Sequence, residues 1–226
     1  SVIFLVDHSA GKISKAAGEL ATYAKSIGES VAVIFADNAD SITSQLNAFQ
    51  VDKVITVAGQ WDKYGAPAIA EGLAQIVAAK NPAAVLITST ATGKEIAARV
   101  SVITGSGIIT DAVNVDKELI TTQSVFGGST TVHSTVTKGV PVITLRANSI
   151  EAVAATSTPV IETFAATISD AAKLAPISSA TPVVKGGRPD LTEASIVVSG
   201  GRGTNGDFKP VEALADALGA AVGASR

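Results

Sequence analysis

The stretch VAVIFADNADSITSQLNAFQVDKVITVAG, residues 31–59, contains one complete strand–helix–strand unit. Residues 31–36 and 54–58 are short apolar runs that indicate buried strands, and residues 42–49 have the apolar spacing of a short helix. Strands that alternate with helices favour a parallel sheet, because a helical connection returns the chain to the same end of the sheet. The stretch therefore predicts an α/β fold.

The same alternation extends to both sides of this unit. Residues 2–6 and 84–88 are further apolar strands, and helical spacing recurs in residues 13–27, 69–80 and 96–103. We predict an open, mostly parallel sheet with helices on both faces, a Rossmann-like α/β architecture. Ligands of such sheets bind beyond the carboxyl ends of the strands. The sequence places small polar residues there: Asp7-His8-Ser9, Asp37-Asn38, Gly59-Gln60 and Ser89-Thr90.

The second half of the chain changes its hydrophobic period from helical to alternating. Four β-rich runs separated by glycine or charged turns are expected to complete the sheet, some of them antiparallel: residues 108–115, 120–126, 130–136 and 142–145. Residues 176–189 are rich in Pro, Gly, Ser and Thr, as linkers are. We therefore predict a base domain at residues 1–186. Residues 187–226 are predicted to be a linker and the first β-α-β part of a second α/β domain.

The composition excludes several classes of function. Lys and Arg number 17 against 20 Asp and Glu, a net charge of −3 without a basic stripe, so no nucleic-acid partner is expected. The chain has no cysteine and two distant histidines, which leaves no disulfide, thiolate chemistry or transition-metal site. No apolar run approaches the ~18 residues of a membrane span, so no direct membrane insertion is expected. Because no basic leader is visible, we expect a cytoplasmic protein, or one of the mitochondrial matrix if the source is eukaryotic.

Residues 199–208, SGGRGTNGDF, contain a G-x-G-x-x-G spacing at Gly201, Gly203 and Gly206. An apolar strand precedes the spacing and a helix-like stretch follows it, which is the arrangement that cradles phosphates. Arg202, a permanently charged guanidinium inside the turn, suits an anionic ligand. The alternative is a plain glycine-rich connection, and the acidic residue that binds ribose ~20 positions later in dinucleotide sites is missing.

Three other candidate sites have simpler explanations. TGKE at residues 92–95 resembles part of a P-loop but lacks Ser or Thr after the lysine, so it fits a helix start capped by Thr92. DHS at residues 7–9 contains the residue types of a catalytic triad, yet neighbours in sequence do not face each other as a triad requires, so a turn is expected. Trp61 and Tyr64 are either a ligand lid or a plug of a loop against the core. No catalytic residue is predicted.

Several segments resemble the alpha subunits of electron transfer flavoproteins. Near the C-terminus the matching residues are SGGRG at 199–203, Phe208, Leu214-Ala215 and AVGASR at 221–226. In the middle they are ARV at 98–100, GIITDAV at 107–113, FGGST at 126–130 and PVITLRAN at 141–148, with Ala147 where the family usually has proline. The resemblance covers essentially the whole chain.

The resemblance implies a heterodimer of an alpha and a beta subunit that carries electrons on one FAD. The implied donors are dehydrogenases, notably acyl-CoA dehydrogenases, and the implied acceptor is a membrane quinone oxidoreductase or a similar protein. The N-terminal domain would form a base with the beta subunit, and the C-terminal domain would hold FAD. Arg202 and Ser225 would contact FAD, together with Gly201 and Gly203 of the glycine turn. Arg226 would lie beside the isoalloxazine ring, where its charge would stabilise the anionic reduced flavin and raise its potential.

The FAD domain of the family continues beyond the Gly-Ala-Ser-Arg motif, with segments that have no counterpart in this chain. The chain is therefore expected to be an alpha subunit cut within its cofactor domain and, by itself, to bind FAD weakly or not at all. Two alternatives stay open. One is a stand-alone nucleotide-binding α/β enzyme that uses the loops at Asp7, Asn38 and Ser89, and the other is a scaffold module with a degenerate flavin domain.

Overall fold

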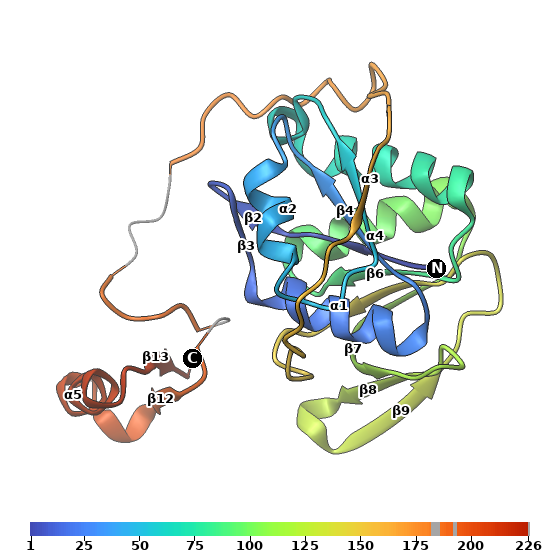
Figure 1. Ribbon diagram of the computed structural model, residues 1–226. Helices are drawn as coiled ribbons and strands as arrows, with labels where there is room; N and C mark the ends of the chain where they lie inside the picture. The colour runs from blue at the N-terminus through green and yellow to red at the C-terminus, as the bar shows by residue number, and fades with distance from the viewer. Residues whose placement is uncertain (182–185, 192–193, 226) are drawn as a thin grey trace. The chain divides into compact units, whose positions relative to one another are not determined.

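A computed structural model describes residues 1–181, 186–191 and 194–225 of the chain. The chain divides into two compact units, Ser1–Ser178 and Ser179–Arg226 (Figure 1). The first unit contains the large sheet, and the second contains a small β-α-β fold. The predicted division into domains at residues 1–186 and 187–226 stays a prediction.

The first unit is built on a sheet of nine strands, counted over the described residues, in the order β11-β5-β4-β1-β6-β10-β7-β8-β9. From one edge, the strands that pair in parallel are β11 (Val160–Thr163), β5 (Lys53–Val57), β4 (Ser30–Phe35), β1 (Val2–Leu5), β6 (Ala84–Thr88), β10 (Val142–Leu145) and β7 (Ile108–Val115). The chain moves from β1 outward to β5 and then returns to β6, on the other side of β1. The predicted open, mostly parallel sheet is confirmed.

The parallel strands form because their apolar runs are buried on both faces. Every residue of β1, β4, β6 and β10 is buried. A sheet covered on both faces needs strands that are apolar along their whole length, whereas a sheet with one wet face needs alternation. The sequences VIFL, SVAVIF, AVLIT and VITL come close to the first requirement, because their only polar residues are Ser30, Thr88 and Thr144, one in each of the last three.

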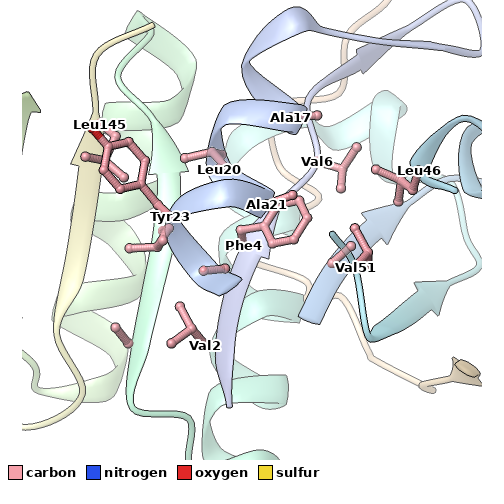
Figure 2. Close-up of a cluster of buried hydrophobic side chains, with 14 of the residues drawn as sticks. Val2, Phe4, Val6, Ala17, Leu20, Ala21, Tyr23, Leu46, Val51 and Leu145 are labelled. Carbon is pink, nitrogen blue, oxygen red and sulfur yellow. The ribbon is translucent and has the colours of Figure 1, made fainter. Parts of the chain in front are cut away.

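Helices cover both faces of the parallel sheet, as predicted. α1 (Lys15–Ile27) and α2 (Asp40–Leu46) pack on one face, and α3 (Trp61–Lys80) and α4 (Ala91–Thr104) pack on the other. Figure 2 shows the core on the first face, where Phe4 of β1 lies beside Leu20 and Ala21 of α1. Ile3 points to the opposite face and joins the core under α3 and α4. Burying a side chain of this size contributes roughly 1.5–3 kcal/mol to stability.

Two further strands extend the sheet beyond β7 in the antiparallel sense. β8 (Thr121–Val125) pairs with β7, and β9 (Thr130–Ser134) pairs with β8. A short 3-10 segment, Phe126–Gly128, connects β8 to β9. The prediction that some strands of this region are antiparallel is therefore confirmed.

The loop after β5 differs from the expectation. α3 begins at Trp61 rather than near residue 69, and it bends at Gly65, whose φ of 60° and ψ of −146° are not helical. Trp61 is 1% exposed and meets Phe35 edge to face, with ring centroids 4.8 Å apart. Trp61 therefore packs its loop against the core, as the second of the two explanations proposed, and is not a ligand lid.

Two small elements have no counterpart in the sequence prediction. Residues 7–9 lead into a hairpin of β2 (His8–Ser9) and β3 (Lys12–Ile13), which turns at Ala10 and Gly11 with φ of 49° and 74°. β11 is a strand with only two apolar residues, and it forms because its backbone pairs with β5 along the free edge. Such pairing is a tertiary effect that local patterning does not reveal.

Candidate cofactor-binding site

The second unit places a glycine loop at the carboxyl ends of two parallel strands. β12 (Val197–Gly200) and β13 (Ala221–Ala224) pair with Gly200 opposite Ala224. Parallel neighbours require a crossover, which α5 (Lys209–Leu218) supplies. The two strand ends therefore lie side by side, at the edge where α/β folds bind ligands.

The loop between β12 and α5 is held by its own backbone. The Thr204 N–H and Oγ1 both donate to the Gly201 carbonyl, at 3.0 and 2.9 Å, and close a 3-10 turn over Arg202–Thr204. Asn205 and Gly206 follow with φ of 48° and 86°, in the left-handed region that favours such residues. The loop therefore presents its central residues in one defined conformation.

The glycines of this loop have two different roles. A Cβ at Gly200 would lie 3.0 Å from the Phe208 ring, so Gly200 permits close packing of β12 against the start of α5. A Cβ at Gly203 or Gly206 would have nothing within 4 Å. In a dinucleotide fingerprint the last glycine of G-x-G-x-x-G packs helix against strand. Here Gly200, outside that spacing, does so, and Gly203 leaves the loop backbone open to a ligand.

The structure brings together the predicted cofactor contacts that it describes. Gly201, Arg202 and Gly203 follow β12 directly, and Ser225 follows β13. The Ser225 N–H donates to the Gly200 carbonyl at 3.1 Å, and a Cβ at Gly201 would lie 3.1 Å from the Ser225 hydroxyl. The remaining predicted contact, Arg226, lies outside the described residues.

No described residue neutralises the charge of Arg202. Its guanidinium forms no ion pair or hydrogen bond with any residue that the structure describes. Arg99, Arg146 and Arg188, by contrast, each face a carboxylate. All N–H donors of the Arg202 guanidinium are therefore free for an anionic ligand, which the planar fork can bind through two bonds at once.

Arg188 ties the beginning of the second unit to α5. Its Nε and Nη2 donate to the two carboxylate oxygens of Asp216 at 2.6 and 2.9 Å, and its Nη1 lies 3.8 Å from Glu212. These bonds lower the pKa of the Asp216 carboxyl and raise the pKa of Arg188. Residues 212 and 216 lie one helical turn apart on the same side of α5, so Arg188 contacts two successive turns of the helix.

The helix start predicted at residues 92–95 is present, but the predicted cap is wrong. α4 begins at Ala91, and Thr90 rather than Thr92 is its cap, with its hydroxyl accepting the Gly93 N–H at 2.9 Å. Glu95 forms an ion pair with Arg99 at 2.9 Å. The cap lies earlier because β6 ends at Thr88 and the chain turns into the helix at once.

The two histidines take part in local contacts, and Asp7 is half-buried. The Nε2 of His8 lies 3.0 Å from the Phe35 carbonyl, and the Nδ1 of His133 lies 3.3 Å from the Thr122 hydroxyl. Burial raises the pKa of the Asp7 carboxyl. Over the described ranges, no group of three or more His, Cys, Asp and Glu could hold a metal ion. No helix there is long and apolar enough to cross a membrane.

Sequence reasoning missed an ionic cluster at the carboxyl ends of β6 and β10, where these strands meet the middle of β7. Asp111 accepts the Ser89 hydroxyl at 2.7 Å and the Lys94 ammonium at 3.2 Å, and the Arg146 Nε lies 4.0 Å away. The Ser89 hydrogen bond, followed by Lys94 and Arg146, lowers the pKa of Asp111. Charged residues within otherwise apolar β-rich runs are the signal that could have revealed it.

A cleft of about 800 Å³ also lies between α3 and α4, away from this cluster. Its walls are mostly apolar, with Ala74, Val77 and Ile103 among them. Two of its polar side chains already have protein partners, since Gln75 donates to the Thr167 carbonyl at 2.7 Å and Ser106 accepts the Val140 N–H at 3.1 Å. The cleft contains no group that points to chemistry.

Two family models match the chain, one in each unit. The electron transfer flavoprotein domain matches residues 2–169, and the electron transfer flavoprotein FAD-binding domain matches residues 190–226. The second match contains the whole β12–loop–α5–β13 fold. The class of protein is therefore electron transfer flavoprotein.

Curated relatives narrow the class to one of its subunits. The electron transfer flavoprotein subunit alpha of Mycobacterium tuberculosis (strain ATCC 25618 / H37Rv) is 41% identical over 231 residues, covering 100% of this chain and 72% of the relative. The subunit alpha of Mycobacterium leprae is 39% identical, covering 99% of this chain and 72% of the relative. That of Syntrophomonas wolfei is 33% identical, covering 98% and 72%. The chain belongs to the electron transfer flavoprotein alpha subunit family.

Proposed function

We propose that the chain acts as the alpha subunit of a heterodimeric electron carrier that binds FAD at the loop after β12. It accepts electrons from dehydrogenases, acyl-CoA dehydrogenases among them, and passes them to a membrane quinone oxidoreductase or a similar acceptor. Its partner is a beta subunit, which the base domain at residues 1–186 contacts. It works in the cytoplasm, or in the mitochondrial matrix of a eukaryotic source.

One observation carries the proposal: the Arg202 guanidinium, which has no partner among the residues that the structure describes, lies in an open loop at the ends of two paired parallel strands. The loop lies within the segment that matches the FAD-binding family model. FAD carries two phosphates, and a guanidinium with free donors is a strong partner for phosphate oxygens. The absence of a side chain at Gly203, where the surrounding space is open, lets a ligand approach the backbone.

The residues present fit FAD, and each has a distinct role in the proposal. Arg202 binds an anionic oxygen, Gly201 and Gly203 offer backbone close to the ligand, and Ser225 offers a hydroxyl beside Gly201. Bound FAD supplies reversible electron uptake at its ring, which no side chain of the chain can supply. Arg226 follows Ser225 in sequence, so its charge is proposed to favour negative charge on the ring and raise the potential.

A reduction experiment tests the carrier function. The gene product is combined with the beta subunit encoded in the same genome and with FAD, and the complex is isolated by gel filtration. An acyl-CoA dehydrogenase and its acyl-CoA substrate are then added without oxygen. Bleaching of the flavin absorbance is expected, and a control without acyl-CoA should stay oxidised. An FAD-loaded complex that no dehydrogenase reduces would contradict the proposed donor class.

A further inference from the structure

The position of the Arg202 charge depends on the backbone of its loop. Arg188, for comparison, is held by both carboxylate oxygens of Asp216. The Arg202 guanidinium has no partner of that kind among the residues that the structure describes. A long side chain without a partner keeps much of its rotamer freedom, so the direction in which it leaves the backbone decides what its charge can reach.

Hydrogen bonds hold the peptide units on both sides of Arg202. The Gly201 carbonyl, in the unit before it, accepts the Thr204 N–H at 3.0 Å and the Thr204 hydroxyl at 2.9 Å. The Arg202 carbonyl, in the unit after it, accepts the Asn205 N–H at 3.1 Å. Because each peptide unit is planar, holding both units restricts φ and ψ of Arg202. Two of these three bonds come from Thr204.

The methyl group of Thr204 packs at the end of β12. A Cβ at Gly200 would lie 2.9 Å from the Thr204 Cγ2 and 3.0 Å from the Phe208 ring, so the methyl group and the ring occupy the space beside this glycine. The Thr204 carbonyl also accepts the Asp207 N–H at 2.9 Å, just before α5. Thr204 therefore connects the turn around Arg202 to the strand before it and to the helix after it.

We propose that Thr204 is a positioning residue for Arg202. Its hydroxyl group keeps the turn closed before FAD binds, so the loop does not have to be ordered at the expense of binding energy. If the turn is open part of the time, FAD binds more weakly, because only the closed fraction is competent to bind. The proposal gives Thr204 no contact with FAD. It rests on the proposed function, since it takes Arg202 as an FAD ligand.

Two substitutions separate the hydroxyl group of Thr204 from its methyl group. Thr204→Val keeps the shape of the side chain and removes the hydroxyl bond to Gly201, whereas Thr204→Ser keeps the hydroxyl group. The FAD affinity of the heterodimer is measured by flavin fluorescence titration. Thr204→Val is expected to lower it roughly two- to tenfold, which is what one net hydrogen bond contributes. Thr204→Ser is expected to keep most of the affinity.

A double-mutant cycle tests whether Thr204 acts through Arg202. In the Arg202→Ala background, Thr204→Val is expected to lower the FAD affinity by at most about twofold, because no guanidinium is left to position. A threonine with a merely structural role, or one whose hydroxyl group binds FAD itself, would lower the affinity by the same factor in both backgrounds. Such additive losses would overturn the proposal.

Ser129 offers a matched control in the first unit. Its N–H and its hydroxyl both donate to the Phe126 carbonyl, at 3.4 and 3.0 Å, which is the same pair of bonds at another 3-10 turn. Ser129→Ala is expected to bind FAD like wild type, and a loss equal to that of Thr204→Val would overturn the proposal.

Hydrogen exchange of the free chain gives a readout that does not depend on FAD. The amides of residues 204 and 205 close the turn, so they are expected to exchange faster in Thr204→Val than in wild type. The amides of α5 are expected to stay unchanged, which would show that the second unit remains folded. Loss of protection throughout α5 would make Thr204 a residue of the fold and would overturn the proposal.

The outcomes distinguish this inference from the proposed function. If the wild-type heterodimer binds no FAD, or if Arg202→Ala binds it as tightly as wild type, the loop is not the FAD site and the inference fails with it. If Arg202→Ala weakens binding but Thr204→Val binds like wild type, the inference alone is overturned.

Discussion

Asp111 holds an unusual backbone conformation through its side-chain contacts. Its φ of 58° lies in the left-handed region, within β7, where the pairing with β10 is irregular. The Ser89 hydroxyl and the Lys94 ammonium bind its carboxylate, and the Thr144 hydroxyl accepts its backbone N–H at 3.0 Å. Asp and Asn tolerate this backbone conformation better than other side chains, which explains the residue type as well as the charge.

The charge of Asp111 predicts a pH-dependent contribution to stability. Its folded pKa lies below the ordinary value of 3.8, mainly because of Ser89 and Lys94. The carboxylate therefore stabilises the fold above about pH 4 and loses this effect as the pH falls through its folded pKa. Asp111→Asn is expected to lower the free energy of unfolding at pH 7 by at most about 1 kcal/mol, because water screens the ion pairs. Urea unfolding at pH 7 and pH 3 measures the difference, which should be smaller at pH 3 because the carboxylate loses its effect as the pH falls towards its folded pKa.

Asp111→Ala separates the effect of the charge from that of the backbone. Alanine loses the same ion pairs but tolerates the left-handed conformation less well than asparagine, at a further cost of roughly 1–2 kcal/mol. This additional loss should persist at pH 3, unlike the loss in Asp111→Asn. A constant gap between Asp111→Asn and wild type at both pH values would show that the charge is not the cause.

At the scale of elements, α5 is anchored more by one arginine than by a core. In this part of the second unit, Ala215 is the buried residue of the helix, and Leu214 and Leu218 are about half exposed. Arg188 binds the same helix through Asp216, the neighbour of Ala215, and through Glu212 one turn earlier. These contacts of Arg188 with Asp216 and Glu212, called the Arg188 clasp below, therefore fix where the chain enters the β-α-β fold.

A charge swap tests the clasp. Arg188→Glu and Asp216→Arg are each expected to speed hydrogen exchange in residues 186–191, because each leaves like charges facing each other. The double variant should restore part of the protection, although Glu212 would still face the new Glu side chain. Equal exchange in wild type and both single variants would show that the clasp does not hold the segment. Added salt should reduce the protection of wild type.

Elements with strong patterns were predictable, and elements made by tertiary pairing were not. Residues 31–36 and 84–88 are strands because apolar runs of that length need burial on both faces, which the sequence reveals directly. β11 and the first turn of α3 depend on neighbouring elements instead. β11 forms because it pairs with β5, and the first turn of α3 forms where Trp61 packs against Phe35. In the candidate site, the loop residues were predicted from a motif. The packing role of Gly200 was not, because it depends on the Phe208 ring.

At the scale of the whole molecule, the chain consists of two units joined by an exposed segment. Unit boundaries fall at Ser178 and Ser179, and residues 173–181 are exposed. Exposed segments with few contacts are cut first by proteases. The large sheet has a hydrophobic core on each face, both within the first unit, so we expect this unit to stay folded without the second.

Limited proteolysis tests this division. A brief digestion is expected to cut between residues 173 and 191 and to leave a stable fragment that contains the nine-stranded sheet. Mass spectrometry of the fragment locates the cut, and its thermal unfolding should remain cooperative. Early cuts within the sheet, or a fragment that unfolds at once, would contradict an independently folded base domain.

The most direct test of FAD binding by the Arg202 loop is the FAD affinity of the heterodimer, measured by flavin fluorescence titration. Arg202→Ala is expected to weaken binding roughly ten- to a hundredfold, since a hydrogen bond to a charged group contributes about 1.5–3 kcal/mol. Arg99→Ala, which removes an arginine already paired with Glu95, should bind FAD like wild type. Unchanged affinity in Arg202→Ala, or an equal loss in both variants, would contradict the assignment of the loop as the flavin site.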